Sequence, residues 1–202
     1  MQHATSIATD LAARGWSCCD DFVTPARVAE LRAQALRLSE RGDFRAAAVG
    51  AGKGRAIRPT TRGDEISWIA PPFPEPLTCL AGDLEQLRLT LNRDLTLGLF
   101  YLEFHFARYA PGRGYARHSD QLAGSEARVV SWALYLNDDW RAEEGGALRL
   151  YMQAQARTPF VEFPPRGGRL MVFLSERFEH EVRPATRDRW SITGWFRRRT
   201  DS

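Results

Sequence analysis

The spacing of apolar side chains changes at Leu99, and this change constrains the fold more than any other feature of the sequence. Beyond Leu99, apolar residues recur at every second position, first over 100–106 and again over 130–136. A period of two places alternate side chains on opposite faces of a strand. Strands are therefore expected at 100–107, 129–136, 147–151, 160–163, 169–174, 179–183 and 190–197. Their number and the Gly-containing turns between them favour a sandwich or jelly roll.

The N-terminal half shows the helical period instead. Thr24 is a good cap for a helix that starts at Pro25 and continues to Gly42 with apolar residues at helical spacing. Leucines over 77–95 mark a long amphipathic helix, and a short helix is expected at 7–14. Short strands are expected at 16–22 and 65–69, with a long loop rich in Gly, Ala and Arg at 46–63. We therefore expect a mainly β protein with supporting N-terminal helices packed on one sheet.

A length of 202 residues fits one domain. Within it, we expect mostly helical support and a loop over 1–97, the jelly-roll core over 98–197, and a basic tail over 198–202. Apolar residues make up 44% of the chain, which excludes disordered and fibrous proteins. The N-terminus lacks the features of a signal peptide, and no apolar run approaches the ~18 residues of a membrane helix. The sequence predicts a cytoplasmic protein with no membrane partner.

The positive charge comes almost entirely from arginine. Of 28 cationic residues, 27 are arginine and only Lys53 is lysine, against 25 acidic residues. The arginines are spread along the chain, and the one dense run, 197–199, lies near the C-terminus. This distribution is typical of a solvated surface with a basic tail rather than of a nucleic-acid-binding face.

Cysteine is too scarce to carry metal chemistry. Two of the three cysteines are adjacent, so neither a disulfide framework nor a four-thiolate site is available. A metal site must be built from carboxylates and from the four histidines, His3, His105, His118 and His180.

His118 and Asp120 are two residues apart, which in a strand places both side chains on one face. His180 lies sixty residues after Asp120, on a strand that a jelly roll can bring alongside. Two imidazoles and one carboxylate form the facial triad of non-haem Fe(II) enzymes, which leaves positions open for a cosubstrate and O₂. The alternative for His118 and Asp120 is a surface salt bridge or a turn. For His105 we expect a structural role.

Two further residues suit an anionic ligand. Arg189 begins a strand on which Ser191, Thr193 and Trp195 share its face, and its planar guanidinium suits the far carboxylate of a dicarboxylic keto acid. The alternative is an internal ion pair with Asp or Glu. Tyr135 shares a face with two small residues and could donate to the same carboxylate, although by itself such a tyrosine is more often a core residue.

Six segments resemble the Fe(II)/2-oxoglutarate prolyl 4-hydroxylases, and most closely the hypoxia-inducible-factor prolyl hydroxylases and their bacterial relatives. They are 62–68 (RGDEISW), 108–120 (RYAPGRGYARHSD), 135–140 (YLNDDW), 145–150 (GGALRL), 180–185 (HEVRPA) and 189–195 (RWSITGW). The resemblance covers about 46–197. It implies a double-stranded β-helix, with 98–197 as the catalytic core.

The resemblance also implies roles for individual residues. Iron would be bound by His118, Asp120 and His180, and 2-oxoglutarate by Arg189, Tyr135 and Thr193. The pocket near the metal would be lined by Tyr109, Leu148, Val182 and Trp195, and the substrate groove bordered by Arg62, Asp64 and Trp68. The cosubstrates would be 2-oxoglutarate and O₂, with ascorbate keeping the iron reduced.

The expected reaction is hydroxylation of C4 of a prolyl residue in a cytoplasmic protein or peptide, with a translation factor such as elongation factor Tu as one candidate. 2-Oxoglutarate would be converted to succinate and CO₂. One alternative is hydroxylation of a free amino acid or other small molecule, and another is a non-catalytic oxygen- or metal-sensing module. A nucleic-acid dealkylase would carry a second arginine at position 195, where this chain has tryptophan. We expect a monomer.

Overall fold

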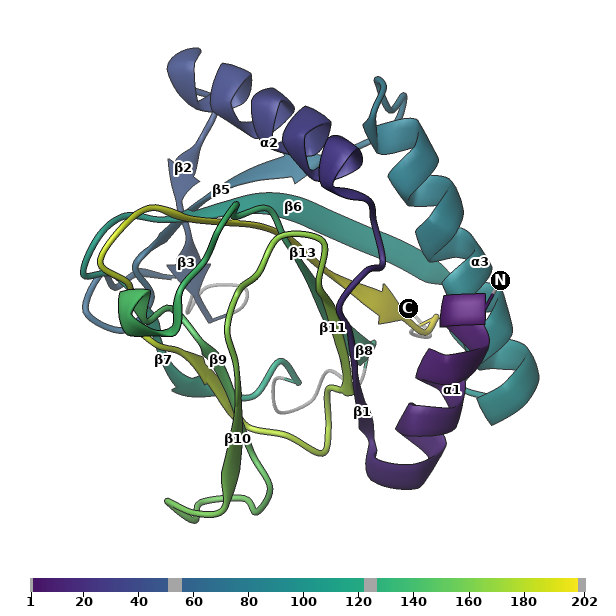
Figure 1. Ribbon diagram of the computed structural model, residues 1–202. Helices are drawn as coiled ribbons and strands as arrows, with labels where there is room; N and C mark the ends of the chain where they lie inside the picture. Colours follow the sequence, from purple (N-terminus) through teal and green to yellow (C-terminus); the bar gives the residue numbers. More distant parts are fainter. Residues whose placement is uncertain (1, 51–55, 122–126, 200–202) are drawn as a thin grey trace.

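The computed structural model describes residues 2–50, 56–121 and 127–199. Two antiparallel sheets form the body of the protein (Figure 1). The large sheet has the strand order β1 (Trp16–Cys19), β11 (Leu170–Leu174), β8 (Arg128–Tyr135), β13 (Arg189–Arg197), β6 (Tyr101–Tyr109), β5 (Asp64–Ile69), β2 (Arg45–Ala46). The small sheet has the order β10 (Phe160–Phe163), β9 (Leu148–Tyr151), β12 (His180–Val182), β7 (Tyr115–His118). The expected jelly roll is confirmed.

Three helices cover the outer face of the large sheet: α1 (Gln2–Arg14), α2 (Pro25–Glu40) and α3 (Leu77–Leu95) (Figure 1). The hydroxyl of Thr24 caps α2 by accepting from the Arg27 amide at 3.4 Å. In α3 the buried residues are leucines three or four positions apart, which form one apolar face. These leucines join Trp132, Ile192 and Phe196 of the sheet in the main core. The helices therefore support the large sheet from behind, as expected.

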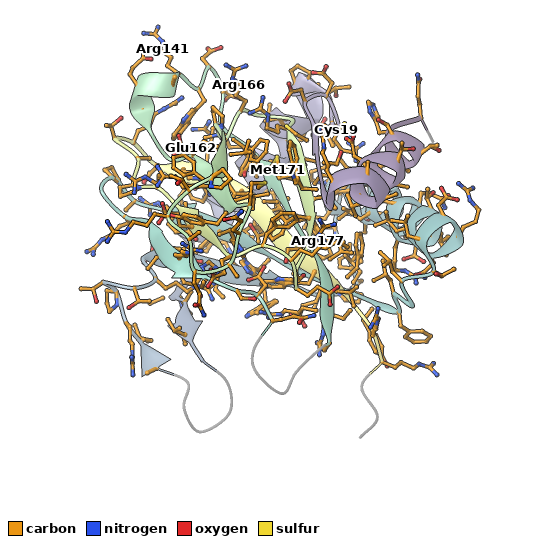
Figure 2. All side chains as sticks on the ribbon, turned by 90° about the horizontal axis from the view of Figure 1, so that it is seen from below. Cys19, Arg141, Glu162, Arg166, Met171 and Arg177 are labelled. Carbon is orange, nitrogen blue, oxygen red and sulfur yellow. The ribbon has the colours of Figure 1, made fainter. Side chains whose placement is uncertain are left out.

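A second, smaller core lies between the two sheets. It contains Tyr135, Leu148, Leu150, Phe163, Met171, Phe173 and Phe178. In Figure 2, Met171 lies inside the molecule, whereas Arg141 and Arg166 project from its edge. Side chains alternate between the two faces of β13. Ile192 and Phe196 face the helices, whereas Thr193 and Trp195 face the other sheet. The inner face of the large sheet is thus free to line a cavity.

Several boundaries differ from expectation, most clearly in the N-terminal half. Helix α1 begins at Gln2 rather than at residue 7, and β1 ends at Cys19 rather than at residue 22. The stretch 46–63 was expected to be a loop, but it contains β3 (Ala48–Val49) and β4 (Ala56–Ile57), which pair with each other. Two-residue strands are too short to show a period of two, so only their pairing reveals them.

Two details complete the description. A short 3₁₀ helix spans Ala142–Glu144, just before the Gly145–Gly146 turn. Among the described residues, no helix combines the length and the apolar character that a membrane crossing requires.

Candidate active site

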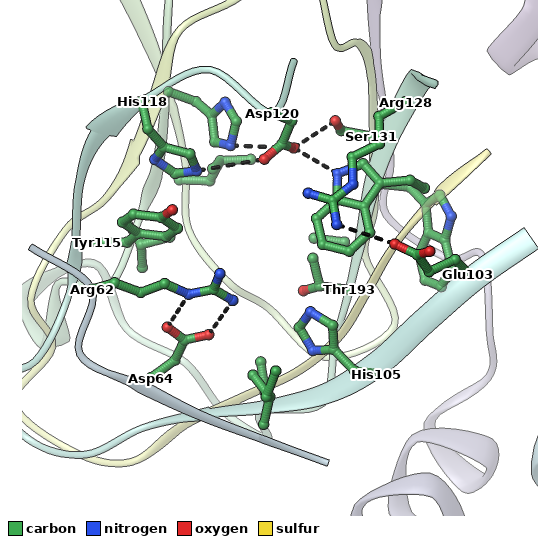
Figure 3. Close-up of a pocket in the computed structure, with 18 of the residues that line it drawn as sticks. Arg62, Asp64, Glu103, His105, Tyr115, His118, Asp120, Arg128, Ser131 and Thr193 are labelled. Carbon is green, nitrogen blue, oxygen red and sulfur yellow. Dashed lines mark hydrogen bonds and ion pairs between the residues drawn. The ribbon is translucent and has the colours of Figure 1, made fainter. Parts of the chain in front are cut away.

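A cavity of about 610 Å³ opens between the inner face of the large sheet and the small sheet. Figure 3 shows the side chains that point into it. It is lined by β5, β6, β8, β11 and β13 of the large sheet, by β7, β9 and β12 of the small sheet, and by β3. Residues more than 100 positions apart therefore meet around one space.

The three expected metal ligands meet at this cavity. β7 and β12 are paired with His118 opposite His180, so the register of the small sheet sets the two imidazoles side by side. Asp120 lies beyond the end of β7, so it is not on the same strand as His118 as we had expected. Its Oδ1 is 3.6 Å from His118 Nε2, and its Oδ2 is 3.6 Å from His180 Nε2. One ligand atom from each residue lies within 4.8 Å of the others.

Main-chain carbonyls orient both imidazoles. The Nδ1 of His118 lies 2.8 Å from the carbonyl of Ala116, and the Nδ1 of His180 lies 3.3 Å from that of Phe178. Because a carbonyl only accepts, each Nδ1 carries the proton and each Nε2 is left with a lone pair facing Asp120. Burial lowers the pKa of His180 to about 4, which keeps it neutral at physiological pH.

The carboxylate of Asp120 is held by two donors on the large sheet. Ser131 Oγ donates to Oδ2 at 2.6 Å, and Trp195 Nε1 donates to the same oxygen at 2.9 Å. Burial opposes the charge, but the hydrogen bonds that Ser131 and Trp195 donate stabilise the ionised form, and the pKa of Asp120 lies well below its usual value. Two neutral imidazoles and an ionised carboxylate are the donor set that suits Fe(II) with open positions, so the three residues fit that metal.

Arg189 lies elsewhere on the cavity wall and is only 3% exposed. Its Nε donates to the carbonyl of Gly146 at 2.8 Å. It forms no ion pair with any residue of 2–50, 56–121 or 127–199, so the internal ion pair that we considered is not found there. A buried guanidinium without a carboxylate is costly unless an anion is supplied from outside.

Tyr135 lies next to Arg189, with its ring centroid 5.0 Å from the guanidinium carbon. It is completely buried, and its hydroxyl has no hydrogen-bond partner in the described chain. Burial raises the pKa of this phenol to about 12, so it stays protonated and able to donate. An unpaired cation and an unpaired donor side by side fit a buried carboxylate.

The other expected residues are also placed at the cavity. Its wall includes Thr193, Tyr109, Leu148, Val182 and Trp195. Arg62 and Asp64 form a bidentate ion pair of 2.8 and 3.0 Å at one side of it (Figure 3). Trp68 is 51% exposed and lies at the edge.

The sequence analysis missed several wall residues. Tyr115 stacks on His118 with ring centroids 3.5 Å apart, and Ser131 binds Asp120. His105 was expected to be structural, yet it lines the cavity. It lies on the same strand face as Tyr109, which the family resemblance had assigned to the pocket, and the two observations together could have indicated this position.

Comparison with known proteins agrees with this geometry. A family model for the 2OG-Fe(II) oxygenase superfamily matches residues 104–197. The crystal structure of a Pseudomonas putida prolyl-4-hydroxylase is 39% identical, with a TM-score of 0.87, over 98% of this chain and 100% of that one. The chain belongs to the 2OG-Fe(II) oxygenase superfamily. Enzymes of this superfamily use Fe(II), 2-oxoglutarate and O₂.

Within the superfamily, several of the similar proteins are prolyl hydroxylases. A prolyl hydroxylase from Trichoplax adhaerens, solved with a hypoxia inducible factor peptide fragment, is 27% identical with a TM-score of 0.85, over 97% of this chain and 89% of that one. Human Egl nine homolog 1 is 34% identical over 144 residues, which are 67% of this chain. The match spans only 33% of that human protein. The expected resemblance to prolyl hydroxylases is confirmed.

Proposed function

We propose that this protein hydroxylates C4 of a prolyl residue in a protein or peptide, in a reaction that depends on Fe(II), 2-oxoglutarate and O₂. The observation that carries the proposal is the 39% identity to the Pseudomonas putida prolyl-4-hydroxylase over essentially the whole of both chains. The His118, Asp120 and His180 cluster and the unpaired Arg189 supply the side chains that the chemistry requires.

His118, Asp120 and His180 would hold the iron. When bound, iron with 2-oxoglutarate activates O₂, so that one oxygen atom enters a C–H bond and the other enters succinate as CO₂ is lost. Trp195 and Ser131 keep the Asp120 carboxylate ionised and correctly turned.

Arg189 and Tyr135 would bind the distal carboxylate of 2-oxoglutarate. The guanidinium supplies the charge and a planar fork, and the phenol supplies a further donor. Thr193 lies two residues before Trp195 on the same face of β13, and its hydroxyl would support the same pocket. Arg189 and Tyr135 are buried, which keeps water away from the bound carboxylate.

The substrate would enter over Arg62, Asp64 and Trp68. Trp68 is half-exposed at the edge of the cavity, and Arg62 and Asp64 line one side of it. This arrangement suits an extended peptide better than a small molecule. We propose a cytoplasmic protein as the substrate, with elongation factor Tu as a candidate, and ascorbate as the reductant that maintains Fe(II).

The test compares the proteomes of cells with and without this protein for a gain of one oxygen on proline. We expect such a site, and expect it to disappear in cells carrying His118→Ala but not in cells carrying His3→Ala, which changes an exposed histidine far from the cavity. Hydroxylated free amino acids without any modified protein would instead establish the small-molecule reaction.

A further inference from the structure

His105 is a buried polar residue for which the mechanism above has no use. It lies on β6, is 2% exposed, and lines the cavity (Figure 3). Its ring is packed between two tryptophans, with centroids 4.9 Å from Trp68 and 5.7 Å from Trp195. A polar ring clamped between aromatic rings has a fixed orientation, so the direction of its free nitrogen is determined.

Only one tautomer of His105 is compatible with its surroundings. Nδ1 lies 3.1 Å from the carbonyl oxygen of Phe106, which can only accept, so Nδ1 carries the proton. Burial lowers the pKa of His105 to about 4, so the ring is neutral. Nε2 is therefore a lone-pair acceptor, and it has no partner among the described residues.

2-Oxoglutarate cannot supply the missing partner. Its two carboxylates and its keto group are all hydrogen-bond acceptors at neutral pH, and two acceptors repel each other. His105 pairs with Thr193 across β6 and β13, four residues from Arg189 along β13.

The neighbours of His105 place it between the edge of the cavity and the metal site. On β5 its cross-strand partner is Trp68, the half-exposed residue at the edge of the cavity. On β13 the next inward-facing residue beyond Thr193 is Trp195, which contacts the metal ligand Asp120. An acceptor between the entrance and the metal site faces whatever enters past Trp68.

We infer that His105 is a specificity-determining residue whose Nε2 accepts a hydrogen bond from an N–H or O–H donor of the substrate segment that enters the cavity past Trp68. The inference rests on the proposed function and adds a feature of the substrate. A prolyl nitrogen in a peptide bears no hydrogen, so the donor belongs to a residue next to the target proline. It is either a main-chain amide or a side-chain donor.

The test pairs two variants with modified substrates. His105→Asn keeps a donor near Nδ1 for the Phe106 carbonyl but removes the acceptor at Nε2, whereas His105→Gln restores an acceptor near Nε2. The substrate is a synthetic peptide centred on the proline found by the proteomic comparison. In one series each main-chain amide is N-methylated in turn, and in the other each side-chain donor is replaced by an apolar group.

We expect one modified peptide to lose about three- to tenfold in kcat/KM with the wild type and to lose nothing further with His105→Asn. An N-methylated peptide identifies a main-chain donor, and a replaced side chain identifies a side-chain donor. His105→Gln should recover most of the loss, and the KM for 2-oxoglutarate should stay unchanged in both variants. If each modified peptide loses the same factor in kcat/KM with the wild type as with His105→Asn, the inference is overturned.

A second readout does not depend on turnover. In Zn(II)-loaded protein labelled with ¹⁵N-histidine, the Nε2 resonance of His105, assigned by its loss in His105→Asn, should shift on addition of the peptide but not of 2-oxoglutarate. A shift caused by 2-oxoglutarate alone would contradict the inference. If the wild type hydroxylates no peptide at all, the proposed function fails, and the inference fails with it.

Discussion

The indole Nε1 of Trp195 donates a hydrogen bond of 2.9 Å to Oδ2 of Asp120, which joins the large sheet to the metal site of the small sheet. The two residues are 75 positions apart in the chain. Such contacts to metal ligands fix the orientation of the ligand and tune its basicity. The metal site is therefore a property of both sheets together.

Trp195→Phe removes this hydrogen bond while keeping an aromatic ring. We expect the affinity for Mn(II), used as a stable substitute for Fe(II), to fall about 10- to 100-fold, as is usual when a ligand loses its supporting contact. Electron paramagnetic resonance titration measures it. The matched control is Trp190→Phe, on the same strand but facing the helices. Equal affinity in Trp195→Phe and wild type would show that the bond is dispensable.

Arg189→Ala should raise the dissociation constant of 2-oxoglutarate about 30-fold or more, because a buried charged partner is lost. Tyr135→Phe should raise it less, since only one hydrogen bond is removed. Calorimetry on Zn(II)-loaded protein measures both. Arg187→Ala is the control, since Arg187 pairs with Glu144 and does not line the cavity. If all three variants bind 2-oxoglutarate equally, the carboxylate is anchored elsewhere.

His105 should make the metal-free protein less stable in acid. Burial lowers its pKa from 6.5 to about 4, so between these values the unfolded chain binds more protons than the folded one. This contribution to stability is complete above pH 6.5 and is lost as the pH falls through 4, up to about 3 kcal/mol. Urea unfolding between neutral pH and about pH 4 measures it. His105→Asn should show a shallower decline, and parallel curves would argue against a neutral buried His105.

Gly114→Ala should disturb the metal site through the backbone. A Cβ at Gly114 would lie 2.5 Å from the carbonyl oxygen of Val182, so β7 and β12 must separate. These strands hold His118 and His180 in register, and we expect Mn(II) affinity to fall at least about tenfold. Gly82→Ala is the control, because its Cβ meets nothing and should stabilise α3 by about 0.5–1 kcal/mol. Unchanged Mn(II) affinity in Gly114→Ala would mean that the strands adjust without moving the ligands.

The elements that sequence predicted best are those whose pattern is local. Helix α3 runs over Leu77–Leu95 as expected, because a leucine every three or four residues specifies both the helix and its buried face. Strand β10 spans Phe160–Phe163, also as expected. By contrast, β3 and β4 were missed, since two residues carry no periodicity and exist as strands only through their partner.

His105 shows, within the active site, that a local sequence pattern does not determine what a strand face contacts. Alternation along β6 placed it on the same face as Tyr109, but no local pattern indicates whether that face meets the helices or the cavity. Asp120 differs in another way, because its position depends on the turn after β7 and on the donors Ser131 and Trp195 rather than on a strand of its own.

The sequence alone identifies which side chains are available for chemistry. Cysteine is too scarce to bind a metal, so the candidate ligands are His118, Asp120 and His180. An arginine on an alternating strand adds a site for an anionic cosubstrate. The folded structure was needed to show that, within the described residues, Arg189 has no acidic partner and the buried Nε2 of His105 has no hydrogen-bond partner. Whether a buried polar group is satisfied depends on every strand packed around it, and these strands come together only when the two sheets face each other.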